Sequence, residues 1–117
     1  MSEAIIDLKE FLERVQDDRD LLVELLDIYQ EDFTEKRKNL EVGVQKKDFD
    51  QIKSVAHSLK GSSGNISAKP LHACFLKIEQ LAKSSDANGM LEVLGQIDKH
   101  FVELQAYVVQ LKAELKK

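Results

Sequence analysis

Residues 49–67 read FDQIKSVAHSLKGSSGNIS, and the spacing of their apolar side chains predicts a helix with one buried side. At about 100° per residue, the buried side carries Ile52, Val55, Leu59 and Ile66. The opposite side carries polar or small residues, namely Asp50, Lys53, Ser54, His57, Lys60, Gly61 and Gly64. A helix with one apolar stripe packs along that stripe. The segment therefore predicts a packed helix from about 49 to 65 whose His57 faces solvent.

The same helical spacing continues on both sides of this segment. Apolar residues three or four apart indicate further helices over about 4–15, 20–46, 69–83 and 91–115. Long amphipathic helices with short connections are typical of helix bundles. The sequence thus predicts an all-α fold, an antiparallel four-helix bundle over about 20–115, with the short N-terminal helix as a lid.

Short polar residues mark the expected starts of these helices. Asp18 or Asp20 can cap the second helix, and Asp48 can cap the third. Ser67 is suited to capping the fourth helix, because Pro70 follows within its first turn, where proline is tolerated. We therefore expect side-chain caps at all three of these helix starts.

The composition indicates one globular domain, residues 1–117, with 43% hydrophobic residues. The net charge of −4 argues against a nucleic-acid surface. No apolar run approaches the roughly 18–20 residues of a membrane span, and the start MSEAIIDLKE lacks a signal-peptide pattern. A single cysteine, Cys74, excludes an internal disulfide and a cysteine zinc cluster. We expect a cytoplasmic monomer that binds neither nucleic acid nor membrane and holds no metal.

His57 is the candidate functional residue of the exposed stripe. Gly61 and Gly64 share that stripe, although each glycine costs about 1 kcal/mol in a helix interior. Glycine leaves bare backbone, which lets another molecule come close to the imidazole. Lys53 and Lys60 stand four residues before and three after His57, where they favour a negatively charged group on the ring. An ordinary surface histidine is the alternative, and it leaves the two glycines unexplained.

Residues 56–79, AHSLKGSSGNISAKPLHACFLKIE, resemble the signature of histidine-containing phosphotransfer (HPt) domains. The signature is Ala-His-x-Leu-Lys-Gly-Ser-Ser, a turn of small residues, and a second helix ending in Leu/Ile-Glu. The acidic, leucine-rich segment 20–33 resembles the first bundle helix of that family, and the resemblance covers about residues 16–115. Ser67 stands where the family often has glycine, so we expect a slightly different turn.

The resemblance implies a carrier of phosphoryl groups in two-component phosphorelays. His57 would accept the group from an aspartate of a receiver domain and pass it to another receiver. Lys60 would be the cation beside the phosphate, and Gly61 the clearance for the docking partner. The partners would be response-regulator receiver domains and a hybrid histidine kinase, with Mg²⁺ bound to the receiver. The chain itself would need no cofactor, kinase activity or nucleotide site, and it has no glycine-rich phosphate loop.

Glu79 is a candidate for orienting His57. If helices 49–65 and 69–83 fold back near residue 67, both residues lie about 15 Å from the turn at ~1.5 Å per residue. A carboxylate that accepts the proximal N–H would fix the tautomer and leave the distal nitrogen free. A solvated glutamate paired with Lys83 is the equal alternative.

Two other functions are consistent with the same residues. The chain could be the detached phosphoacceptor domain of a chemotaxis-type histidine kinase, whose histidine helix is similar. It could also be a helical interaction module that is never phosphorylated, which predicts no phosphoryl uptake.

The remaining candidates are weaker. His72 and His100 lie on different helices without a ligand cluster around them, and we expect surface residues. Cys74 occupies a core position of its helix. The apolar arc of residues 21–33 is wider than one buried face requires. One edge, either Leu21, Leu25 and Ile28 or Leu26 and Phe33, would be exposed to a partner or packed under the first helix.

Overall fold

A computed structural model describes residues 4–115, and these residues form five α-helices joined by short turns. The helices are α1 (Leu8–Arg14), α2 (Arg19–Lys46), α3 (Phe49–Asn65), α4 (Lys69–Lys83) and α5 (Ala87–Leu115). The described range contains no strand. The predicted all-α fold is confirmed, with a four-helix bundle formed by α2–α5 and a short helix before it.

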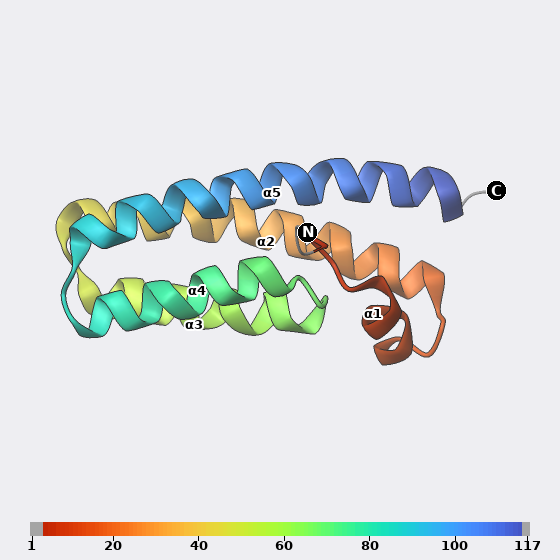
Figure 1. The fold of residues 1–117 in the computed structure, drawn as a ribbon, viewed down its shortest axis with the longest axis horizontal. Helices are drawn as coiled ribbons and strands as arrows, with labels where there is room; N and C mark the ends of the chain where they lie inside the picture. The colour runs from red at the N-terminus through yellow and green to blue at the C-terminus, as the bar shows by residue number, and fades with distance from the viewer. Residues whose placement is uncertain (1–3, 116–117) are drawn as a thin grey trace.

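Helices α2–α5 run alternately up and down the long axis of a molecule that measures 47 × 28 × 20 Å. Figure 1 shows α3 and α4 as a hairpin that is shorter than α2 and α5 and covers one half of them. Beyond the hairpin's turn, α1 packs against the other part of α2. The first helix therefore covers apolar surface of α2 that the shorter hairpin cannot reach.

Helix α1 is shorter than the periodicity predicts, beginning at Leu8 instead of about residue 4. Asp7 caps it, because its carboxylate accepts a hydrogen bond from the Glu10 N–H at 3.1 Å. Ile5 and Ile6 precede the helix yet are buried. These two apolar side chains are buried in an irregular segment. The spacing of apolar residues cannot distinguish such a segment from a helical turn.

Two of the three predicted caps are present. Asp18 accepts from the Leu21 N–H at 3.0 Å, and Asp48 accepts from the Gln51 N–H at 3.2 Å. The predicted cap at Ser67 is wrong, because Ala68 precedes α4 and no side chain caps that helix. Ser67 instead has a φ of 58°, in the left-handed region that glycine adopts at little cost.

The hydroxyl of Ser67 explains how serine occupies this turn. It donates to Glu10 Oε1 at 2.9 Å, and the carbonyl of Ser67 accepts from the Asp7 N–H at 2.9 Å. Lys69 Nζ lies 3.1 Å from a carboxylate oxygen of each of Asp7 and Glu10. The turn between α3 and α4 is thus tied to the start of α1.

This network shifts the titration of its three charged groups. The pKa of Asp7 is lowered by the Glu10 N–H and then by Lys69, and the pKa of Glu10 is lowered by Lys69 and by the Ser67 hydroxyl. Both carboxylates raise the pKa of Lys69. Each carboxylate therefore favours the folded state above its ordinary pKa and loses that contribution as pH falls through its lowered pKa.

The core is aromatic at the level where the hairpin meets the longer helices. Phe33 stacks on Phe101 with ring centroids 3.8 Å apart. Phe33 and Phe75 meet edge-on, with ring centroids 6.1 Å apart. The buried Tyr29 hydroxyl lies 2.7 Å from the Ser63 hydroxyl, which joins α2 to α3. Burial raises the pKa of Tyr29 strongly, so the phenol stays protonated in this pair.

Candidate functional site

His57 projects from α3 into solvent, as the helical wheel predicts. Its side chain is 72% exposed, whereas its neighbours Ala56 and Leu59 are fully buried. The core contacts of α3 therefore fix the helix rotation that turns the imidazole outward. No helix of the described structure covers the ring.

Glu79 reaches His57 from α4, because the hairpin brings the two residues to the same level. Its Oε1 atom lies 3.5 Å from His57 Nδ1 and 2.9 Å from Lys60 Nζ. The glutamate side chain is only 12% exposed. The predicted proximity of Glu79 to His57 is present, and the alternative of a solvated Glu79 paired with Lys83 does not describe this structure.

The charge on Glu79 is maintained despite its burial. Burial alone would raise its pKa, but the Lys60 ammonium, with a smaller contribution from His57, outweighs burial and lowers the pKa. The ammonium lies 2.9 Å from Oε1, and a carboxylate oxygen has lone pairs for more than one donor, so this oxygen can also accept from the ring. The nearest ring nitrogen, Nδ1, is the natural donor after a small movement. An N–H at Nδ1 leaves the lone pair on Nε2.

The two glycines on this face of α3 have different surroundings, because Gly61 is exposed whereas Gly64 is half-buried. A Cβ built on Gly61 would meet no atom within 4 Å, so the space beside this glycine is open. A Cβ on Gly64 would lie 3.3 Å from Nδ1 of His72. The same ring nitrogen lies 3.0 Å from the backbone carbonyl oxygen of Lys60. His72 is therefore half-buried against α3, not the free surface residue that the sequence suggests.

A cavity of about 410 Å³ opens beside His57, toward the N-terminal end of α3. Its lining comes from α3 and α4: Asp50, Lys53, Ser54, His57, Glu79 and Lys83. From the sequence, Lys53 is predicted as a residue of the site, whereas Lys83 is considered only as an ion-pair partner of Glu79 and not as a residue beside His57. The available signal was the position of Lys83 one helical turn after Glu79.

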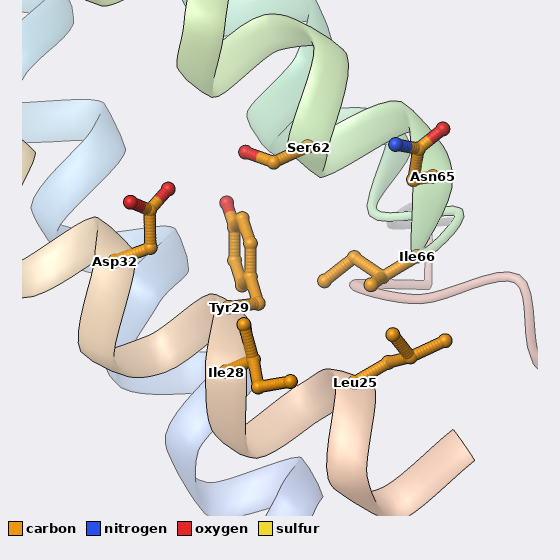
Figure 2. Close-up of a pocket in the computed structure, with 7 residues that line it drawn as sticks. All are labelled: Leu25, Ile28, Tyr29, Asp32, Ser62, Asn65 and Ile66. Atoms are coloured by element: carbon orange, nitrogen blue, oxygen red, sulfur yellow. The ribbon is translucent and has the colours of Figure 1, made fainter. Parts of the chain in front are cut away.

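A second cavity of about 260 Å³, with several apolar side chains in its lining, lies between α2 and α3. Figure 2 shows Leu25, Ile28 and Ile66 toward one end of it and Asp32 at the other. Ser62 and Asn65 belong to its α3 wall and adjoin the glycine stripe in sequence. Leu21 and Ile28 are 38% and 53% exposed, whereas Leu26 and Phe33 are buried. The exposed edge of the wide apolar arc is therefore the one with Leu21 and Ile28.

The other sequence candidates lie away from this site. Cys74 is buried, and burial raises the pKa of its thiol, which suits a core residue better than a nucleophile. His100 is half-buried on α5, with Nδ1 3.9 Å from Glu103. Among residues 4–115 there is no group of three or more His, Cys, Asp or Glu side chains placed to hold a metal ion. None of the helices described has the length and apolar character needed to cross a membrane.

The family model of the Hpt domain matches residues 8–114, and the chain belongs to that family. Family membership supports a role in histidine phosphotransfer within phosphorelays, in which Hpt proteins act as carriers alongside two-component partners.

Two solved structures share the fold. Histidine-containing phosphotransfer protein B from Pseudomonas aeruginosa PAO1 superposes with a TM-score of 0.88 at 22% identity, covering 97% of this chain and 98% of that one. A rice protein assigned to the histidine-containing phosphotransfer proteins gives 0.81 at 19% identity, covering 97% and 86%. No curated protein matches the chain in sequence. At these identities the likeness establishes the fold.

Proposed function

We propose that His57 carries a phosphoryl group between receiver domains, accepting it from one aspartyl phosphate and delivering it to another aspartate. The observation that supports this most is the state of the ring. It is exposed, held by core contacts of α3, and has Nδ1 beside a buried carboxylate. In the tautomer protonated at Nδ1, such a ring presents the lone pair of Nε2 outward.

The transfer step needs little chemistry from this chain. In the tautomer protonated at Nδ1, the Nε2 lone pair attacks phosphorus and forms the N–P bond. The P–O bond to the receiver's aspartate breaks, and its electron pair returns to the carboxylate. The Nδ1 proton stays on the ring, where the charge of Glu79 stabilises the cation that forms. Phosphoryl transfer depends mainly on position and charge neutralisation, which Mg²⁺ and a lysine of the receiver would supply.

Lys60 and the glycines have supporting roles in this proposal. The Lys60 ammonium sits 2.9 Å from Glu79 and one turn from His57, where it can stabilise an added phosphate as well as the carboxylate. Lys53 provides a second cation on the same stripe. Gly61 leaves open space for the receiver's approach, and Gly64 extends the low surface to the ring of His72.

The apolar cavity between α2 and α3 offers a docking surface next to the site. Ser62 and Asn65 of its wall alternate along α3 with Gly61 and Gly64, so the cavity borders the stripe that a receiver must approach. The exposed Ile28 would bury apolar surface against that partner. We therefore propose a receiver domain as the occupant of this surface.

Phosphoryl uptake from a phosphorylated receiver tests the proposal. The protein should acquire acid-labile, base-stable phosphate, and the His57→Gln variant should acquire none while keeping its melting temperature. His100→Gln is the matched control, because it removes an imidazole away from the site and should label normally. Labelling of His57→Gln equal to that of the unmodified protein would contradict the assignment.

A second incubation tests the carrier role against kinase activity. With ATP and Mg²⁺ but no partner, the protein should remain unlabelled. Stoichiometric labelling under those conditions would show that the chain catalyses its own phosphorylation.

A further inference from the structure

The cavity beside His57 is lined by two lysines that lack ion-pair partners within the described residues. Lys53 comes from α3 and Lys83 from α4, so two helices bring cations to one hollow. Lys60, in contrast, is held by Glu79 at 2.9 Å and does not line the cavity. The cations that face open space beside the ring are therefore Lys53 and Lys83.

The charges around the ring are unbalanced in the unphosphorylated protein. Three lysines, Lys53, Lys60 and Lys83, face two carboxylates, Asp50 and Glu79. Counted without the imidazole, these side chains carry one net positive charge. A phosphoryl group of charge about −1.5 to −2 would meet a favourable field there. Because both exposed lysines have flexible four-carbon stems, their ammonium groups can rise to the outward nitrogen of the ring.

We propose that Lys83, with Lys53 and the hydroxyl of Ser54, forms a cradle that binds the phosphoryl group once it is attached to His57. This inference rests on the proposed function of His57. It assigns the direct phosphate contacts on this side of the ring to a lysine of α4, while Lys60 acts first on Glu79. Ser54 stands one turn before His57 and lines the same cavity, where its hydroxyl can donate to a phosphate oxygen.

The cradle explains the position of Lys83 better than a purely structural role does. A lysine in the last turn of α4 complements the helix dipole wherever on the circumference it stands. The helix dipole does not explain which face of α4 carries Lys83. Lys83 stands one turn after Glu79, on the face that lines the cavity beside His57. Lys77 of the same helix is also exposed but is rotated by about 160° from Glu79, away from this cavity.

The test compares Lys83→Met and Lys53→Met with the control Lys77→Met, each of which removes one charge and keeps most of the stem. The proteins are phosphorylated by phosphoramidate, from which Nε2 takes the phosphoryl group as ammonia leaves with its electron pair, or by a phosphorylated receiver. Phosphorus NMR across a pH series then measures proton binding by the phosphoryl group on His57. Melting temperatures are recorded alongside.

A cation a few ångströms away stabilises the dianion, so its loss should raise the phosphoryl group's proton-binding constant about threefold at low salt. We expect this change in Lys83→Met and in Lys53→Met, but not in Lys77→Met, and restoration in Lys83→Arg. The difference should shrink in 1 M salt, which screens exposed charges.

Failure of the cradle and failure of the carrier role give different results. If Lys83→Met is labelled and titrates like Lys77→Met, the cradle is refuted while His57 remains the carrier. If the unmodified protein takes no phosphoryl group from either donor, the proposed function fails and the cradle fails with it.

Discussion

Gly61 provides a sharp test of the site because folding and docking make opposite demands on it. The glycine lies in the interior of α3, is exposed, and would place a Cβ in space that holds no atom within 4 Å. An alanine therefore fits without strain. Relative to glycine it should stabilise the helix by about 1 kcal/mol. For a domain of this size that corresponds to a rise of roughly 4 °C in melting temperature.

Two other glycines calibrate this expectation. Gly95 lies in α5, is exposed, and also has no neighbour within 4 Å of a built Cβ. Gly95→Ala should therefore stabilise the protein as much as Gly61→Ala. Gly64→Ala should gain less, because its new methyl group would lie 3.3 Å from the His72 ring. A melting temperature lowered by Gly61→Ala would contradict the structure at this position.

Docking should respond in the opposite way. Gly61→Gln places a long side chain one turn beyond His57, on the surface that a receiver must cover. We expect phosphotransfer at least tenfold slower at low receiver concentration, through weaker binding, with the fold intact. The assay is transfer kinetics over a range of receiver concentrations, with Gly95→Gln as the control that should transfer normally. Normal transfer by a folded Gly61→Gln protein would show that the partner does not approach over Gly61.

Three further substitutions test the packing and the charges. Tyr29→Phe should lower the free energy of unfolding by about 1–2 kcal/mol, because it leaves the buried Ser63 hydroxyl unpaired; chemical denaturation measures this, and no change would refute the pairing. Lys60→Ala should destabilise by a similar amount by leaving Glu79 without its cation, and should slow transfer about tenfold. An unchanged stability and rate would make Lys60 an ordinary surface lysine. Lys69→Met should lower the melting temperature at neutral pH but not in acid, because the pKa values of its two carboxylate partners are lowered and their contribution disappears as they protonate. A difference that persists in strong acid would exclude this ion network.

Helical periodicity predicts much of this fold because its signal accumulates over long segments. The bounds of α3 and α4 match the expected ranges, and α2 begins within one residue of its prediction. The last helix begins at Ala87, inside a polar stretch that suggests a turn, because Asp86 accepts from the Gly89 N–H at 2.9 Å. Such a bond depends on local backbone geometry, and the residue types alone do not decide it.

Two features near the turn between α3 and α4 could not be predicted from the sequence, and the physical reason is the same for both. Ser67 looks like a helix cap, but its left-handed backbone and its bond to Glu10 depend on where α1 packs. His72 looks like a surface residue, but its ring rests on Gly64 because the hairpin brings the two helices together there. Glu10 is 57 residues from Ser67, and His72 meets α3 only because the hairpin folds back, so the tertiary arrangement is needed to identify either partner.

The site itself was partly predictable from spacing. The wheel places His57 outward, and equal distances from the turn bring Glu79 to its level. The pairing of Lys60 with Glu79 was missed, because a wheel of α4 places Lys83 one turn after Glu79 but does not include Lys60, which lies on α3. Burial decides between them, since Glu79 lies within the hairpin interface toward Lys60.

The central claim is that His57 carries the phosphoryl group on its outward nitrogen while Nδ1 faces Glu79. Nitrogen NMR of the imidazole, recorded before and after phosphorylation by a receiver, tests it most directly. We expect the unmodified ring to be protonated at Nδ1 and the phosphorylated ring of His57 to show its N–P bond at Nε2. Phosphate on Nδ1, or on any residue other than His57, would contradict the account.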